Sequence, residues 1–161
     1  MQERYWKKLT DKRYRLIYIN EYYNQCVWVQ RFINVILAIT SSGAIAAWAV
    51  WKEFPVVWAG VIAVSQVITA VKPLLPYEKR IETIYDMINQ MTVICNEIES
   101  KWYYVANGSL TEEEINDLSY KYEKKWSDIE TKNLKGDSIP ADGRLEHIAN
   151  IKKDDYFNND F

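Results

Sequence analysis

The chain has 161 residues, of which 48% are hydrophobic and 26% are charged, and its formal net charge is −2. One histidine and two cysteines are too few for a disulfide framework or a cluster of soft metal ligands. The small net charge hides a division into three parts: residues 1–31 are basic, residues 32–71 carry only Lys52 and Glu53, and residues 72–161 are acidic.

Residues 1–31 are expected to form a basic helix, because no glycine or proline interrupts them. Tyr14, Tyr18 and Tyr22 repeat every four residues and so share one face. Aromatic and basic side chains together could stack on a nucleotide or a nucleic acid. We favour the simpler interpretation, in which the tyrosines pack on other helices and the cations face lipid headgroups, and we expect no nucleic-acid partner.

Residues 32–71 are expected to form a transmembrane hairpin of two helices, 32–51 and 54–71. The first segment has twenty residues without a formal charge and the second has eighteen. At a rise of about 1.5 Å per residue, each reaches roughly 27–30 Å, which is the hydrocarbon thickness of a bilayer. The alternative is a pair of core helices in a soluble bundle, but burying both on all sides would need more protein than the rest of the chain supplies.

Basic residues lie outside both ends of this hairpin and are almost absent from the turn within it. Arg31 precedes the first segment, and Lys72 and Lys79 follow the second, whereas the turn offers only Lys52 beside Glu53. By the positive-inside rule, both termini are expected on the cytoplasmic side of a multi-pass protein.

Small and uncharged polar residues within the two segments are expected to decide which helix faces meet. The candidates for helix packing in the membrane are Ala38, Ser42, Gly43, Ala46, Ala47 and Gly60. The candidates for lining a pore between associated hairpins are Asn34, Ser41, Ser65, Gln66 and Thr69. The same polar groups could instead form hydrogen bonds that only hold the hairpin together, and the sequence leaves both interpretations open.

Residues 72–135 are expected to fold as a cytoplasmic helical hairpin with coiled-coil-like packing. Hydrophobic residues after Tyr77 follow alternating spacings of three and four, which are typical of an assembly seam: Ile81, Ile84, Ile88, Met91, Cys95, Ile98, Trp102 and Val105. Asn107-Gly108 predicts a helix end, and the capping box from Thr111 to Glu114 predicts a returning helix over about 112–132. Whether the seam pairs within one chain or between chains is left open.

Residues 136–161 are expected to form a polar tail with a short helix near 141–151. The single histidine, His147, lies in this tail without a second metal ligand or a nucleophile at suitable spacing. We therefore expect no catalytic residues, no metal, no cofactor and no enzyme activity. Four basic residues are candidates to bind an anionic ligand or a lipid headgroup: Arg13, Arg15, Lys79 and Arg80.

The order of these parts resembles the SLATT family of bacterial membrane effectors. The resemblance is carried by the helix over 3–31, the paired segments 32–51 and 54–71, and the helix that begins at Tyr77 after Lys72-Pro73-Leu74-Leu75-Pro76. It is architectural, and no short diagnostic motif accompanies it.

The resemblance implies an effector that oligomerises in the cell inner membrane and permeabilises it during an anti-phage abortive-infection response. Implied partners are membrane lipids, further copies of the chain, and a nucleotide second messenger or a sensor protein. A ligand could drive such a change only by binding one arrangement of the helices better than another. The alternative is a membrane-anchored scaffold that recruits a partner through its cytoplasmic helical hairpin.

Overall fold

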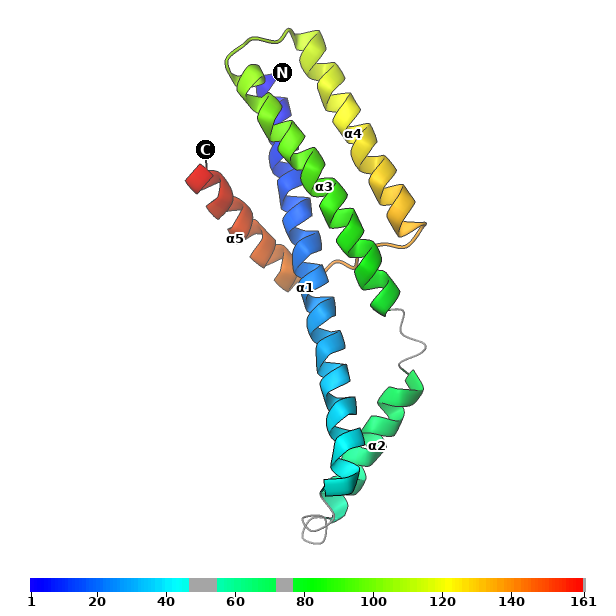
Figure 1. Ribbon diagram of the computed structural model, residues 1–161. Helices are drawn as coiled ribbons and strands as arrows, with labels where there is room; N and C mark the ends of the chain where they lie inside the picture. Colours follow the sequence, from blue (N-terminus) through cyan, green and yellow to red (C-terminus); the bar gives the residue numbers. More distant parts are fainter. Residues whose placement is uncertain (47–54, 72–76, 161) are drawn as a thin grey trace. The chain divides into compact units, whose positions relative to one another are not determined.

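The structure is a computed structural model that describes residues 1–46, 55–71 and 77–160 (Figure 1). Within these ranges the chain is all-helical, as the sequence predicts, apart from the described connections at 107–111 and 135–142. The elements are α1 (Gln2–Ala46), α2 (Pro55–Val71), α3 (Tyr77–Ala106), α4 (Glu112–Leu134) and α5 (Gly143–Asp160).

The chain divides into two compact units. The first, which we call the bundle unit, comprises Met1–Asn24 and Glu82–Phe161. The second, which we call the apolar unit, comprises Gln25–Ile81. Helix α1 contributes to both units, because its first half lies in one and its second half in the other.

The expected transmembrane hairpin is wrong for the described part of the chain. No helix there combines the length and the apolar character that crossing a bilayer requires. Helix α2 has 17 residues, whereas a span needs about 20. Helix α1 is long, but charged residues recur through its first half, and its described part beyond Arg31 comprises only residues 32–46. The predicted multi-pass inner-membrane location and the predicted topology of the termini depended on these spans. Both predictions are therefore wrong for the described part of the chain as well.

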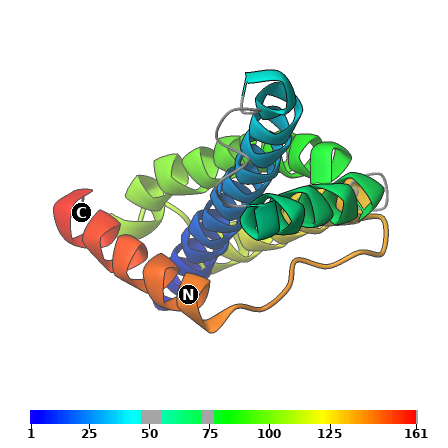
Figure 2. The same cartoon turned by 90° about the horizontal axis from the view of Figure 1, so that it is seen from below.

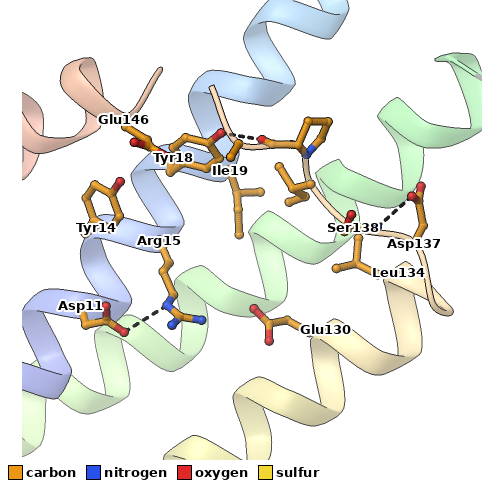
Figure 3. A pocket seen from close by; sticks show the side chains of 13 residues that line it. Asp11, Tyr14, Arg15, Tyr18, Ile19, Glu130, Leu134, Asp137, Ser138 and Glu146 are labelled. Carbon is orange, nitrogen blue, oxygen red and sulfur yellow. Dashed lines mark hydrogen bonds and ion pairs between the residues drawn. The ribbon is translucent and has the colours of Figure 1, made fainter. Parts of the chain in front are cut away.

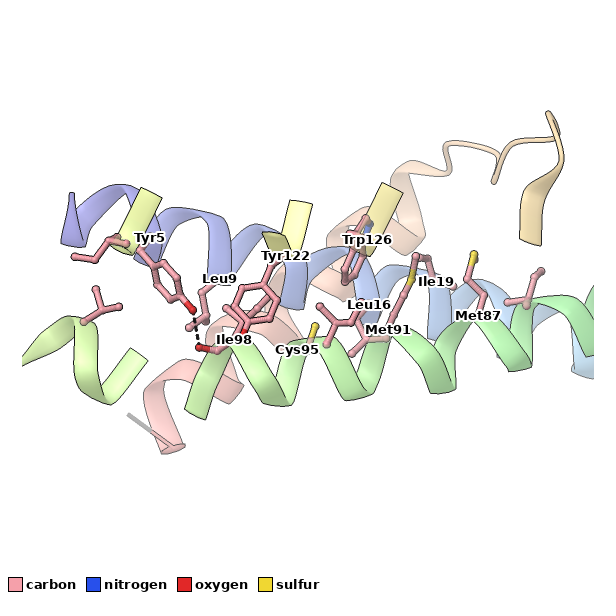
Figure 4. Close-up of a cluster of buried hydrophobic side chains, with 14 residues drawn as sticks. Tyr5, Leu9, Leu16, Ile19, Met87, Met91, Cys95, Ile98, Tyr122 and Trp126 are labelled. Carbon is pink, nitrogen blue, oxygen red and sulfur yellow. Dashed lines mark hydrogen bonds between the residues drawn. The ribbon is translucent and has the colours of Figure 1, made fainter. Parts of the chain in front are cut away.

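Helices α1, α3 and α4 run side by side in the bundle unit (Figures 1 and 2). Their buried side chains form its core (Figure 4). Helix α1 contributes Tyr5, Leu9, Leu16 and Ile19, and α4 contributes Ile115, Tyr122 and Trp126. The contribution of α3 is the predicted seam: Ile84, Met91, Cys95, Ile98 and Val105 are buried, and Ile88 and Trp102 pack against them. The described core therefore uses the seam within one chain.

Met87 and Ile94 on α3 are buried as well, at positions between those of the predicted seam. A two-helix coiled coil buries only two positions in each heptad. The wider apolar stripe of α3 fits a helix that contacts two neighbours at once, and here the neighbours are α1 and α4 (Figure 4).

Local sequence signals set the connection between α3 and α4. Gly108 has a φ of +73°, and the amide of Ser109 donates to the carbonyl of Tyr104 at 3.0 Å. Helix α4 then begins with the predicted capping box. The hydroxyl of Thr111 accepts from the amide of Glu114, and the carboxylate of Glu114 accepts from the amide of Thr111 at 2.8 Å.

Helix α5 is longer than the helix expected near 141–151, and it belongs to the bundle unit. Its N-terminus is capped by Asp142, whose carboxylate accepts from the amide of Arg144 at 2.8 Å. Leu145 and Ala149 are buried, and the ring of Phe157 meets the ring of Trp6 at 5.1 Å between centroids. The tail is thus largely helical and packs on the bundle.

Candidate functional site

The apolar unit exposes large hydrophobic side chains in two regular rows. The row on α1 is Trp28, Phe32, Val35 and Ile39, and the row on α2 is Val57, Val64, Val67 and Val71. The spacings within each row are threes, fours and sevens, which place its members on one face of the helix. We call these the apolar rows.

The apolar rows lie on an almost uncharged part of the molecule. Helix α2 contains no charged residue, and none follows Arg31 in the described part of α1. The α1 row is strongly exposed, with Phe32 at 53% and Ile39 at 58% of their full surface, while the rings of Trp28 and Phe32 stack at 5.5 Å between centroids. Large exposed apolar patches on a protein usually mark protein–protein or membrane interaction sites.

Of the predicted small packing residues, the structure describes the surroundings of Ala38 and Gly60. Ala38 is exposed, and a Cβ added at Gly60 would meet no atom within 4 Å. The described backbone of α1 includes Ser42, Gly43 and Ala46, but the surroundings of their side chains lie outside the description, and Ala47 lies outside it entirely.

The predicted pore-lining residues differ in burial and in hydrogen bonding where the structure describes them. Ser65 is buried and donates to the carbonyl of Ile62 at 2.8 Å, and Thr69 donates to the carbonyl of Ser65 at 2.8 Å. Such bonds satisfy a hydroxyl within its own helix. Gln66 and Asn34 are exposed, and the side chain of Ser41 lies outside the described residues.

The four predicted ligand residues are divided between the two units. Lys79, which is exposed, and Arg80, which is half-buried, belong to the apolar unit. Arg13 and Arg15 belong to the bundle unit and serve different purposes there. Arg15 is exposed and pairs with Asp11 one turn earlier, at 3.0 Å.

Arg13 is the centre of a polar network that joins three helices. Its guanidinium donates to the carboxylate of Glu99 on α3 and, at 2.9 Å, to the hydroxyl of Tyr156 on α5. The same hydroxyl donates to Glu99 at 2.9 Å, and the guanidinium lies 4.2 Å from the centre of the Tyr156 ring. Burial alone would lower the pKa of Arg13, but the hydrogen bonds and charge of Glu99 outweigh it and raise that pKa.

A pocket of about 500 Å³ lies where α1, the end of α4, residues 137–141 and the start of α5 meet (Figure 3). Ile19, Leu134 and Ile139 give it an apolar floor, and the rings of Tyr14 and Tyr18 line its α1 side. The charged residues around it are Asp11, Arg15, Glu130, Asp137 and Glu146. Sequence reasoning found the tyrosine repeat but not the pocket, because its walls come from segments more than one hundred residues apart.

The rim of the pocket is held by Tyr18. Its hydroxyl donates to the carbonyl of Pro140 at 2.6 Å and accepts from the amide of Asp142 at 2.9 Å. The neighbouring Tyr14 has a raised pKa, first because of burial and then because the carboxylates of Glu146 and Asp11 disfavour a phenolate. The phenol of Tyr14 is therefore held in its neutral form at physiological pH.

Cys95 and His147 belong to residue types that often carry catalysis, and they lie in different surroundings. Burial raises the pKa of the Cys95 thiol to about 12, so the reactive thiolate is scarce at neutral pH. His147 is exposed. No three acidic, histidine or cysteine side chains among the described residues gather closely enough to hold a metal ion.

Comparisons with known proteins add no family assignment. No protein-family model, no curated protein and no solved structure matches the chain. The resemblance to the SLATT family therefore stays a prediction from architecture.

Proposed function

We propose that the protein is a non-enzymatic helical protein that self-associates through the apolar rows. Oligomerisation is one half of the effector function expected from the sequence. The other half, permeabilisation of a membrane, required two spanning helices and is not carried forward. The proposed activity is assembly: the apolar unit of one copy binds the apolar unit of another, and each copy carries its own bundle unit.

The observation that carries this proposal is the exposure of two seam-like rows. In α3, hydrophobic residues at spacings of three and four are covered by α1 and α4. In the apolar unit, the same spacing occurs at Trp28, Phe32, Val35 and Ile39, yet each of these side chains is more than half exposed. A helical seam of this type is normally buried against another helix.

A second copy of the chain fits these rows better than a charged partner does. An interface between two identical copies uses the same patch on both, so an uncharged patch meets an uncharged patch and no charge is buried without a partner. The apolar rows contain no charge, and the cores of protein interfaces are likewise depleted of charged residues. Two helices per copy would pair with two from its partner to give a four-helix contact.

The bundle unit supports the proposal by using its own seam internally. Because α3 is covered by α1 and α4, the strongest heptad pattern in the sequence is not available for joining copies. Large exposed hydrophobic side chains occur on the bundle unit as well, but the long exposed rows lie on the apolar unit. Assembly is therefore assigned to the apolar unit.

Sedimentation velocity on the full-length chain over about 1–100 μM tests the proposal through the concentration dependence of the oligomer. The informative variant is Val64→Glu, because Val64 is 54% exposed in the α2 row. The matched control is Val93→Glu on α3, where the valine is 58% exposed in the bundle unit. We expect wild type and Val93→Glu to associate equally, and Val64→Glu to associate at least about tenfold more weakly.

Three outcomes would overturn the proposal. The first is a wild-type chain that stays monomeric at every concentration. The second is equal weakening by both valine substitutions, which would point to a general effect of charge. The third is flotation of the wild-type chain with phospholipid vesicles that Val64→Glu abolishes while the oligomer persists, which would assign the apolar rows to lipid.

A further inference from the structure

The pocket in the bundle unit has the volume and the apolar lining that are typical of a small-molecule site. Its volume of about 500 Å³ lies within the range of roughly 300–1,000 Å³ that is typical of such sites. Ile19 and Leu134 supply apolar surface at its base, and Tyr14 and Tyr18 supply two aromatic rings at its side (Figure 3). A ligand with an apolar or aromatic body would find contacts on both.

The charge around the pocket selects against anions. Four carboxylates line it, from Asp11, Glu130, Asp137 and Glu146, against the single guanidinium of Arg15. That guanidinium is already paired with Asp11 at 3.0 Å, so the remaining carboxylates dominate the local field. A nucleotide second messenger, which carries negative phosphates, would be repelled here, although Arg15 was one of the positions predicted to bind it.

The arrangement also fits an organic cation better than a metal ion. The described acidic side chains do not approach one another closely enough to share a metal ion. They are instead spread around rings that have electron-rich faces, and carboxylates with aromatic faces are the usual surroundings of an ammonium group. We propose that this pocket binds a small organic cation, consisting of an amine carried on an apolar or aromatic body.

The pocket is held open by contacts that do not depend on a ligand. The hydroxyl of Tyr18 bonds both the carbonyl of Pro140 and the amide of Asp142, which fixes the loop opposite α1. The carboxylate of Asp137 accepts from the amide of Ser138 at 2.8 Å and orders the same loop. A site formed in advance loses little conformational entropy when it binds. The proposal concerns the bundle unit and is independent of self-association through the apolar rows.

Three probes with one ring system separate the contributions of charge and shape. Tryptamine is a cation, tryptophol is its neutral analogue and indole-3-acetate is an anion of similar size. Isothermal titration calorimetry on the full-length chain should give the tightest binding for tryptamine. We expect tryptophol to bind about tenfold more weakly, and indole-3-acetate to show no measurable binding.

The variant Glu146→Gln tests the pocket while keeping the size of the side chain. It should weaken tryptamine binding about fivefold and leave tryptophol binding unchanged. The matched control is Glu113→Gln in the exposed first turn of α4, which should change neither affinity. No measurable binding of tryptamine, equal affinities for the three probes, or an unchanged tryptamine affinity in Glu146→Gln would overturn the proposal.

Discussion

Arg13 and Arg15 show how two residues of the same type acquire different surroundings in the fold. The charge and position of Arg13 suggested a residue that binds an anionic ligand, and Arg15, two residues later, received the same prediction. In the structure the guanidinium of Arg13 donates a hydrogen bond to the carboxylate of Glu99, which lies 86 residues away in the sequence and balances its charge. Nothing local distinguishes the two arginines, because only the folded bundle brings Glu99 and Tyr156 to one of them.

Replacing Tyr156 by phenylalanine should loosen the junction of α1, α3 and α5. The substitution keeps the ring over the guanidinium but removes a hydroxyl that accepts from Arg13 and donates to Glu99. We expect a loss of about 1–2 kcal/mol in the free energy of unfolding, measured by urea titration. Limited proteolysis should also cut α5 sooner in this variant.

Tyr103→Phe is the matched control, because Tyr103 is 70% exposed on α3. It should leave the free energy of unfolding within about 0.5 kcal/mol of the wild type. Equal effects of the two substitutions would mean that the network around Arg13 adds no stability.

At the scale of single elements, helix ends set by adjacent residues were predictable and docking between distant elements was not. The glycine at position 108 and the capping box at Thr111 lie next to the ends that they define. Helix α5 was underestimated, since the contact of Phe157 is made with Trp6, which is far away in the sequence. Its apolar residues are too sparse to predict a packed helix on their own.

The capping box makes the stability of α4 dependent on pH. Hydrogen bonds from the amide and then the hydroxyl of Thr111 lower the pKa of Glu114 below its ordinary value of 4.5. A lowered pKa means that the contribution is complete above pH 4.5 and is lost as the pH falls through the lowered value. The urea midpoints of wild type and Glu114→Ala should therefore differ most near neutral pH and converge in acid.

Glu113→Ala provides the comparison within the same turn, because Glu113 also lies near the positive end of the helix but takes no part in the capping box. We expect it to lower the midpoint less than Glu114→Ala at neutral pH. An equal decrease of the midpoint in both variants would show that the carboxylate of Glu114 stabilises α4 through the helix dipole and not through the reciprocal capping bonds.

For the whole molecule, two kinds of tryptophan mark the difference between the units. Trp126 is 1% exposed in the core of the bundle unit, whereas Trp28 is 65% exposed in the apolar unit. Trp126→Ala should lower the free energy of unfolding by about 3–5 kcal/mol, because it leaves a cavity between α1, α3 and α4. At concentrations low enough to keep the chain monomeric, Trp28→Ala should change it by less than about 0.5 kcal/mol, because the ring is exposed in the single chain. Denaturant titrations monitored by far-ultraviolet circular dichroism measure both values.

The all-helical class and the seam of α3 were predictable because a periodic pattern is present in the sequence itself. Membrane crossing was predicted from uncharged length alone, and the described helices do not supply that length: α2 begins at Pro55 and ends at Val71. The pocket could not be predicted at all. Its lining brings Ile19 and Ile139 together, and this pairing depends on how the bundle packs and not on a local sequence pattern.

Lys135 ends α4 with a φ of 49°, in the left-handed region that side chains usually avoid, and Gly136 follows with a φ of +90°. A residue other than glycine in this conformation costs about 1–2 kcal/mol, which the fold tolerates here. The amide of Lys135 bonds the carbonyl of Thr131, and that of Asp137 bonds the carbonyl of Leu134 at 2.9 Å. The loop over the pocket thus starts from a tight turn at Lys135 and Gly136. The direction in which it leaves α4 is set by this local backbone conformation and does not depend on the contacts of the pocket rim.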